Sequence, residues 1–320
     1  MSAKSTSEPF GSLSDAAAAA LEAIGPVWGT DIGKHREMVF DAYTPLVAMA
    51  DNSRVTVHRD IAYGSNARQV LDVFMPQQAA LSAAATDGAP ATKPLDVMLF
   101  VHGGAFVRGA KSANGHIYDN VPYWFANQGC IGVNVEYRLA DEAPYPSGAE
   151  DVALAVQWVQ VNIGRYGGNV GRIFLVGHSA GGTHIATLLL DPLMKQSCSR
   201  QVAGAVLLSA RLQVDVLPDN PNAHGVRAYF GCDESLYSAR APGNYTDRAE
   251  VPFMVVNAQY ENPYLDLYGA QFFFELGRNK KYMPRFVQMP KHNHTSLVAH
   301  FNSGEDFLGR EILKFFGAKP

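Results

Sequence analysis

The stretch Arg172–Leu190, which reads RIFLVGHSAGGTHIATLLL, decides the fold. Its first part, residues 173–176, is a short apolar run with β-branched ends, which indicates a buried strand. Its last part, residues 183–190, contains no helix breaker and is predicted to be a helix that packs through Ile185, Leu188 and Leu189. A strand that turns at once into a helix needs small residues on both sides of the turn. The glycines of Gly-x-Ser-x-Gly supply them and let the backbone approach closely.

Ser179 stands at the tip of this predicted turn, clear of the sheet and at the N-terminus of the helix. There the positive end of the helix dipole favours the negative charge that develops in acyl transfer. The strand, turn and helix together are the elbow that presents a nucleophilic serine in hydrolases. The alternative is a glycine-rich turn whose serine only caps the helix. The pentapeptide alone leaves this alternative open, because it occurs by chance in roughly one chain in ten of this length.

A second glycine motif follows the apolar strand predicted at residues 95–101. It is His102-Gly-Gly-Ala-Phe106, whose glycines leave backbone N–H groups uncovered. An anionic tetrahedral intermediate needs two or three such donors, and we predict that they are the N–H groups of Gly103, Gly104 and Ala180. Both motifs should reach the same edge of a parallel sheet, which makes the pair far more specific than either alone. His102 is expected to shape the loop by hydrogen bonding and to take no part in catalysis.

Strands and helices alternate through the rest of the chain. Two strands at 54–63 and 68–76 are predicted to form an antiparallel edge pair, and residues 77–93 an exposed loop. Further helices are predicted at 118–127 and 150–163, and further strands at 130–139, 252–257 and 284–290. This alternation predicts an α/β fold with a mostly parallel central sheet and helices on both faces.

The N-terminal residues 1–53 are expected to be separate from a catalytic domain at 54–320. Residues 1–12 are predicted to be disordered, Ser14-Asp15 to cap an alanine-rich helix ending near Gly25, and residues 31–50 to form a second helix. The apolar stripe of the second helix either packs against the main domain or helps to cover the active site as a cap. The second alternative rests on analogy.

Composition excludes several classes of function. A net charge of −4 and a pI near 6.2 make nucleic acid an improbable partner. No apolar run reaches the length of a membrane span, and the polar N-terminus does not resemble a signal peptide. The three cysteines, Cys130, Cys198 and Cys232, are odd in number and lack metal-site spacing. We therefore expect a cytoplasmic protein without metal or cofactor, with Cys130 in the core.

The chain resembles the α/β-hydrolase superfamily, and within it the bacterial carboxylesterases of the hormone-sensitive-lipase type and their arylformamidase-like relatives. The resemblance rests on HGGAF at 102–106, YRLA at 137–140 with PYP shortly after, and GHSAGG at 177–182, and it extends from about residue 54 to the C-terminus. Two positions depart from the lipase-type pattern: Ala105 replaces a third glycine, and His178 replaces an aspartate. A histidine before the serine is found in the arylformamidase-like branch.

The resemblance implies a triad in the order Ser, acid, His. The acid should follow the strand at 252–257, and the family's offset selects Glu261, with Asp266 as the alternative that is expected to open the next helix. Asp233 and Glu234 precede the strand and fit poorly. The base should follow the last strand, directly before the final helix in an Asn-His pair, which selects His294 over His292.

The sequence therefore predicts a serine hydrolase that cleaves carboxylic esters through an acyl-enzyme. His294 would act as the base, and Glu261 would orient its imidazole and stabilise the imidazolium. Two alternatives stay open: an amide or formamide hydrolase of the arylformamidase type, and a hydrolase-fold protein that binds a ligand without turnover. Residues 229–245 are a candidate lid that carries specificity, and pairing of late strands would give a homodimer.

Overall fold

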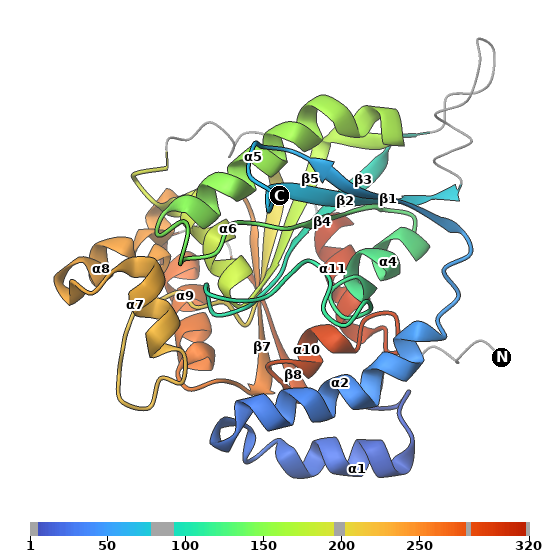
Figure 1. Cartoon of the computed structure of the whole chain (residues 1–320), viewed down its shortest axis with the longest axis horizontal. Coiled ribbons are helices and arrows are strands. Elements are labelled where there is room, and N and C mark those ends of the chain that lie inside the picture. Colours follow the sequence, from blue (N-terminus) through green and yellow to red (C-terminus); the bar gives the residue numbers. More distant parts are fainter. Residues whose placement is uncertain (1–5, 78–92, 195–201, 280–282, 318–320) are drawn as a thin grey trace.

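A single sheet runs through the computed structural model, which describes residues 6–77, 93–194, 202–279 and 283–317. Its eight strands lie in the order β1-β2-β4-β3-β5-β6-β7-β8 (Figure 1). The strands are β1 (Val55–Ala62), β2 (Val70–Pro76), β3 (Leu95–Val101), β4 (Ile131–Val135), β5 (Gly168–His178), β6 (Val202–Leu208), β7 (Phe253–Tyr260) and β8 (Arg285–Asn293).

The pairing of the strands confirms the predicted mostly parallel sheet. β1 pairs antiparallel with β2, as predicted for this edge pair, and β2 also pairs antiparallel with β4. Every other pairing in the sheet is parallel. β4 is shorter than the predicted 130–139, because beyond Val135 the chain leaves the sheet and Arg138 pairs with Asp151 of a neighbouring helix. The loop predicted at 77–93 lies almost wholly outside the described residues.

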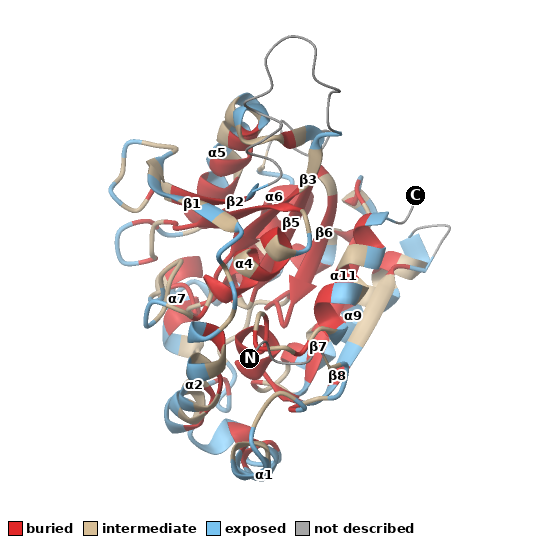
Figure 2. Ribbon diagram, turned by 90° about the vertical axis from the view of Figure 1, so that its right-hand side faces the viewer, coloured by how far each residue is buried: buried red, intermediate tan, exposed pale blue. Residues whose placement is uncertain are grey.

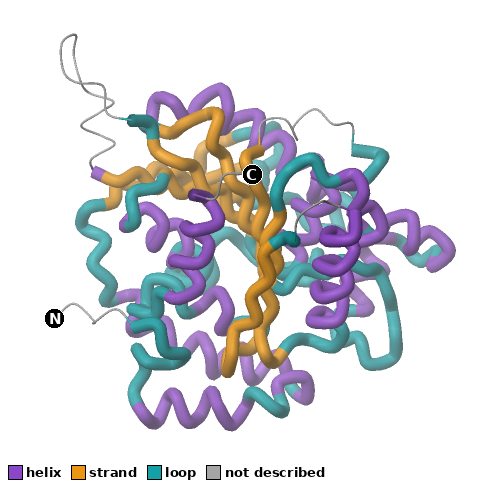
Figure 3. The backbone as a smooth tube through the Cα atoms, turned by 180° about the vertical axis from the view of Figure 1, so that it is seen from behind, coloured by secondary structure: helices purple, strands orange, loops and turns teal. Residues whose placement is uncertain are grey.

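Helices cover both faces of the sheet, which Figure 3 shows as a twisted band of strands between two groups of helices. The helices are α1 (Asp15–Ile24), α2 (Ile32–Ala48), α4 (Asn120–Asn127), α5 (Ser147–Asn162), α6 (Ala180–Leu190), α7 (Ala223–Phe230), α8 (Tyr237–Arg240), α9 (Leu265–Asn279), α10 (Ser296–Ala299) and α11 (Phe307–Gly317). Short 3₁₀ turns occupy Trp28–Thr30, Ile163–Tyr166, Glu234–Leu236 and Pro242–Arg248.

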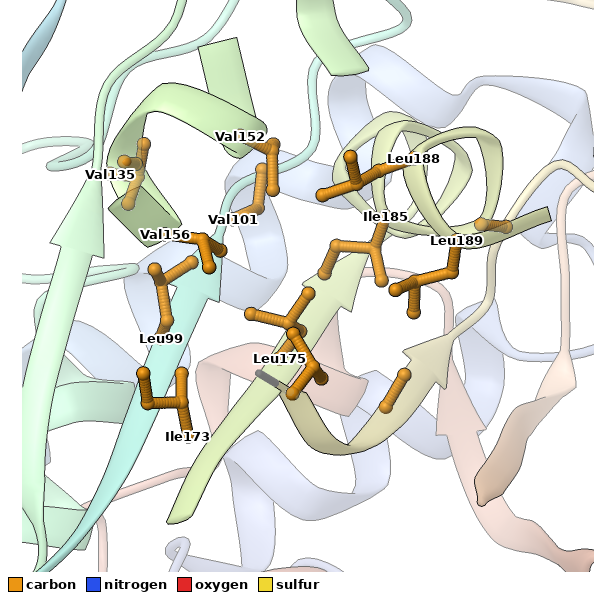
Figure 4. Packing of buried hydrophobic residues seen from close by; sticks show 14 of the residues in the cluster. Leu99, Val101, Val135, Val152, Val156, Ile173, Leu175, Ile185, Leu188 and Leu189 are labelled. Carbon is orange, nitrogen blue, oxygen red and sulfur yellow. The ribbon is translucent and has the colours of Figure 1, made fainter. Parts of the chain in front are cut away.

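One face of the sheet packs against α5, α6 and α9. Leu99, Val101, Ile173 and Leu175 of the central strands meet the apolar side chains of α5 and α6 (Figure 4). All three residues through which the helix after Ser179 was predicted to pack belong to this cluster, namely Ile185, Leu188 and Leu189. The serine turn is therefore held between a buried strand and a buried helix (Figure 2).

The other face packs against α4 and α11. Phe316 of α11 stacks on Phe174 of β5 with ring centroids 4.0 Å apart, and Trp124 and Phe125 of α4 are buried beside them. Cys130 lies in this cluster, as predicted, and burial raises the pKa of its thiol to about 12.

The prediction that residues 1–12 are disordered is wrong for residues 6–12; residues 1–5 lie outside the described part of the chain. The N–H of Thr6 donates to the Gly304 carbonyl at 2.8 Å, and the N–H of Phe10 donates to Glu305 at 3.0 Å. Phe10, the large apolar residue of this polar stretch, is 3% exposed and packs edge-on against His292. Burial of the Phe10 ring and these hydrogen bonds help to hold the segment.

The two N-terminal helices form as predicted. The Ser14 hydroxyl caps α1 by accepting the Ala17 N–H at 3.3 Å, and α2 buries Val39, Tyr43 and Val47. In Figure 1 the two helices lie across the ends of β7 and β8. Contact between Gly25 and the Tyr260 ring, at the carboxyl end of β7, agrees with that placement. The N-terminal segment therefore covers the edge of the sheet at which β7 ends.

Glu305 ties this segment to the rest of the molecule. One oxygen of the buried carboxylate accepts the Tyr43 hydroxyl at 2.8 Å and the Ser12 hydroxyl at 3.0 Å. The other accepts the Phe10 N–H at 3.0 Å and lies 3.5 Å from Nε2 of His292. Burial acts to raise the pKa of Glu305, but the contacts with His292, His300 and Tyr43 outweigh it, and the pKa is lowered.

We predict that Glu305→Gln lowers the free energy of unfolding by about 2 to 4 kcal/mol. The NH₂ group of the new amide would face buried N–H and O–H groups that are themselves donors, so these hydrogen bonds would be lost. Urea denaturation near pH 7 measures the loss, and proteolysis should then cut first within residues 6–50. The control is Glu37→Gln. Glu37 forms an ion pair with Arg36, and its side chain is 60% exposed. Its expected change is below about 0.5 kcal/mol. Equal losses in both variants would contradict the role given to Glu305.

Candidate active site

The candidate residues come together at the carboxyl edge of the parallel strands, where the loops after successive strands meet. His102 follows β3, Ser179 follows β5, Ser209 follows β6, Glu261 follows β7 and His294 follows β8. The sequence therefore brings five polar residues to one edge from strands that are distant along the chain.

Ser179 occupies the turn between β5 and α6 with φ 52° and ψ −120°, a conformation that costs free energy in a residue other than glycine. Its N–H donates to the Leu208 carbonyl of β6 at 2.8 Å, which fixes the turn to the sheet. The turn needs glycine at 181, because a Cβ there would lie 2.2 Å from the Val101 carbonyl oxygen. Within the described residues the Ser179 side chain makes no capping bond to α6, so the helix-cap alternative has no support.

Glu261 and His294 are hydrogen-bonded to each other, with 2.8 Å between Oε2 and Nδ1. The second oxygen of Glu261 accepts the Ala258 N–H at 2.8 Å and the Ser209 hydroxyl. A carboxylate held by these donors can only accept from the imidazole, so Nδ1 of His294 carries a proton. In the neutral ring Nε2 is then the free base.

The competing residues lie elsewhere. Asp266 is exposed in the first turn of α9, where its backbone carbonyl accepts from the Asn257 side chain at 2.9 Å. His292 is fully buried, with Nδ1 3.1 Å from the Ser296 hydroxyl and its other nitrogen facing Glu305. The structure thus pairs His294 with Glu261, whereas His292 faces Glu305, the residue that ties the N-terminal segment to the rest of the molecule.

His178 connects Ser179 to the loop that carries His294. Its Nε2 lies 2.9 Å from the His294 carbonyl oxygen, and the two rings are 4.8 Å apart. Its Nδ1 lies 3.3 Å from the Tyr118 hydroxyl. Burial, and next the nearby His294, lower the pKa of His178 well below its usual value, so the ring stays neutral near pH 7.

Two of the predicted anion-binding residues follow β3 directly. A Cβ on Gly103 would lie 3.0 Å from the Ser179 Cβ, and one on Gly104 would lie 1.7 Å from the Arg108 carbonyl oxygen. Burial raises the pKa of the Tyr118 hydroxyl overall, although the backbone of Gly103 acts to lower it. The Ala180 N–H lies at the N-terminus of α6, where helical N–H groups lack intrahelical partners.

His102 holds the shape of the glycine loop, as predicted. Its fully buried ring lies 2.7 Å from the Gly103 carbonyl through Nδ1 and 3.6 Å from Glu136 through Nε2. It stacks on Tyr137 with centroids 4.3 Å apart, and the Tyr137 hydroxyl donates to the His102 carbonyl at 3.0 Å. Through these contacts the His102 ring supports the glycine loop.

Sequence reasoning missed two residues of this site, Ser209 and Tyr118. Ser209 directly follows the apolar strand β6, and the rule that placed Ser179 at a strand end could have found it. Tyr118 is different, because it lies in a long connection and reaches the site through a positive φ of 76°. No sequence signal marks that conformation.

Two other segments border the site. The Trp28 indole N–H donates to the Asn262 side chain at 2.8 Å, and a cavity of about 280 Å³ lies between residues 25–29 and the 259–263 loop. On another side, Tyr229 of the candidate lid stacks on Phe106 with centroids 4.9 Å apart. The first segment thus contacts the loop that carries Glu261, and the second contacts the loop that follows β3.

Within the described residues, no group of three or more His, Cys, Asp and Glu side chains is placed to hold a metal ion. In the same residues, no helix combines the length and apolar character needed to cross a membrane.

Comparison with known proteins identifies relatives of this chain. A model of the carboxylesterase family matches residues 52–232. Over 146 residues the chain is 34% identical to the esterase LipC of Mycobacterium tuberculosis, covering 45% of this chain and 32% of LipC. Carboxylesterase 1D of Rattus norvegicus is 33% identical over 150 residues, covering 43% of this chain and 25% of the rat protein. The matched part thus spans about a third or less of the length of these curated relatives.

Solved structures are similar over nearly the whole chain. A bacterial heroin esterase superposes with a TM-score of 0.68 at 21% identity, covering 96% of this chain and 98% of that structure. A hyperthermophilic esterase from the archaeon Pyrobaculum calidifontis gives 0.67 at 21% identity, covering 95% and 98%. At this identity the likeness concerns the fold, and it confirms the α/β-hydrolase fold predicted from the sequence.

Proposed function

The chain belongs to the carboxylesterase family, and on this premise we propose that it is a serine esterase whose catalytic triad is Ser179, His294 and Glu261. The observation that carries the proposal is the 2.8 Å bond between Glu261 and His294, beside a serine held at positive φ on a strand-to-helix turn. Serine, acid and histidine also follow each other along the chain in the order that this fold uses.

In the proposed reaction the Ser179 hydroxyl attacks the ester carbonyl while Nε2 of His294 accepts its proton. Glu261 keeps the imidazole in the required tautomer and stabilises the imidazolium that forms. The imidazolium then gives its proton to the departing alcohol, which leaves Ser179 acylated. A water molecule, deprotonated by His294, attacks the acyl group, releases the acid and restores the serine.

The negative oxygen of each tetrahedral intermediate would be held by backbone N–H groups at the edge of the sheet. Gly104 and Ala180 are the donors that best fit this role. Gly103 stays in the predicted set, because it follows β3 directly and lies against Ser179. Each donor that an oxyanion loses costs about 10²- to 10³-fold in turnover in such sites.

The N-terminal helices and the segment around Tyr229 would restrict access to Ser179. The contact of Trp28 with Asn262, one residue after Glu261, supports a cap role for the N-terminal segment. The stacking of Tyr229 on Phe106 supports a specificity role for residues 229–245. We therefore propose small esters as the substrate class, because these two segments would restrict access to Ser179.

A second candidate function is cleavage of amides or formamides. His178 favours it, because a histidine before the serine distinguishes the arylformamidase-like branch. The proposed esterase differs from this candidate in how it treats the leaving group, since an amine must be protonated to depart whereas a phenolate need not be.

We predict that phenyl acetate is hydrolysed with a kcat/KM at least about 100-fold higher than acetanilide, because the anilide requires full proton delivery from His294. Parallel assays of the two compounds, which share an acyl group and a ring, measure the ratio. A ratio near one would favour the amide hydrolase over the esterase. A protein that turns over neither compound would support the ligand-binding alternative.

We also propose that the protein is cytoplasmic. Among the described cysteines, Cys130 and Cys232 are free thiols, one buried and one exposed. An exposed free thiol fits a reducing compartment.

A further inference from the structure

Tyr118 is held in an unusual backbone conformation next to the candidate site. It has a φ of 76°, which costs a non-glycine residue on the order of 1 kcal/mol or more and persists only where neighbouring contacts enforce it. The enforcing residue is Asn120, whose side-chain oxygen accepts the Tyr118 N–H at 2.8 Å. The amide nitrogen of Asn120 donates to the Val298, Ala299 and Phe301 carbonyls at 2.8, 3.1 and 2.9 Å. Tyr118 is thereby fastened to α10, which begins two residues after His294.

The hydroxyl of Tyr118 stands between two parts of the candidate site. It lies 3.3 Å from Nδ1 of His178. Burial raises the pKa of Tyr118 to about 12, although the backbone of Gly103 acts to lower it, so the hydroxyl keeps its proton at neutral pH. It can therefore donate to His178.

Hydrogen-bonding roles fix the direction of the next bond. Nε2 of His178 lies 2.9 Å from the His294 carbonyl oxygen, which can only accept. Nε2 must then carry the proton, and in a neutral ring Nδ1 becomes an acceptor. The Tyr118 hydroxyl is the matching donor. The hydrogen bonds run from Tyr118 to His178 and from His178 to His294.

We infer that Tyr118 and His178 are positioning residues that hold the His294 backbone at a fixed place relative to Ser179. This inference rests on the proposed function, since it assigns roles around the proposed triad. Glu261 holds the His294 ring through Nδ1, and His178 holds the same residue through its carbonyl. With both ends held, the free Nε2 keeps one position relative to the serine. A displacement of about 1 Å at such a site lowers turnover by about 100-fold.

The role predicts a loss in kcat with little change in KM, because neither side chain is expected to bind substrate. We expect Tyr118→Phe to lower kcat about 10-fold and His178→Leu about 100-fold, each with KM within about twofold. The double variant should lose about 100-fold, since both residues act through one chain of bonds; independent effects would multiply to about 1,000-fold. His178→Gln, which can still donate an N–H toward His294, should recover about 10-fold over His178→Leu.

Tyr63→Phe is the matched control. It also removes a partly buried tyrosine hydroxyl, which here donates to the Glu136 backbone carbonyl at 2.6 Å and takes no part in the bonds that reach His294. Stopped-flow hydrolysis of p-nitrophenyl acetate gives kcat and KM, and thermal unfolding shows whether each variant is folded. In Tyr63→Phe the melting temperature should fall while kcat stays within about twofold.

Several outcomes would overturn the inference. One is a folded Tyr118→Phe protein with wild-type kcat, which decides the matter even if His178→Leu does not fold. A second is a double variant whose loss in kcat equals the product of the two single losses. A third is a loss in kcat for the Tyr63→Phe control that equals the loss for Tyr118→Phe. Failure of the proposed function itself looks different, because the wild-type protein would then hydrolyse no ester and leave Ser179 unlabelled by a phosphonate.

Discussion

Ser179→Ala is expected to yield a folded protein whose kcat for ester hydrolysis is lower by about 10⁴- to 10⁶-fold. The variant keeps the oxyanion donors and the Glu261–His294 pair but removes the oxygen that attacks the carbonyl. Stability should change by less than about 1 kcal/mol, because one half-buried hydroxyl is lost from a turn held by backbone bonds and packing. Initial rates with p-nitrophenyl acetate at high enzyme concentration, with circular dichroism as the folding check, give both quantities.

The control for this variant is Ser53→Ala, an exposed serine in the turn before β1. Its activity should match that of the wild type. If Ser179→Ala kept more than about a tenth of the wild-type rate, water would be attacking directly or another residue would be the nucleophile. Either result would remove the acylation of Ser179 from the mechanism.

Glu261→Gln is expected to lower kcat by about 10³- to 10⁴-fold while the protein remains folded. The amide is nearly isosteric with the carboxylate, but it brings no charge to the imidazolium and does not enforce the tautomer with the proton on Nδ1. Its NH₂ group would also meet the Ser209 hydroxyl or the Ala258 N–H, both of which face the carboxylate in the wild type. The kcat for p-nitrophenyl acetate, with KM measured in parallel, tests the prediction.

Asp266→Asn provides the comparison, because Asp266 is the other acid that the sequence offered. It is exposed in the first turn of α9, and its removal should leave kcat within about twofold. The assignment would be reversed if Asp266→Asn lost the activity and Glu261→Gln kept it.

The central part of the fold could be predicted because its signals are local. The apolar run at β5, the glycines around Ser179 and the unbroken helix after them each restrict the backbone directly. The same holds for the loop after β3, where steric contacts allow only glycine at 103 and 104. Parallel strands then bring such loops to one edge whatever their spacing along the chain.

The remaining features depend on contacts between distant parts of the chain. Residues 6–12 look disordered in sequence, yet Phe10 binds a carboxylate 295 positions away. His292 and His294 are almost adjacent and differ only in whether Glu305 or Glu261 faces them. Tyr118 reaches the site through a positive φ that no local pattern requires. In each case tertiary packing decides between local alternatives of similar free energy.

The measurement that tests the central claim most directly is mass mapping of the protein after reaction with a serine-directed p-nitrophenyl phosphonate. The account predicts one adduct per chain on Ser179, together with loss of p-nitrophenyl acetate hydrolysis in proportion to labelling and no adduct in Ser179→Ala. An adduct at another residue that tracks the loss of activity, or full hydrolytic activity in a protein labelled at Ser179, would contradict the assignment of Ser179 as the nucleophile.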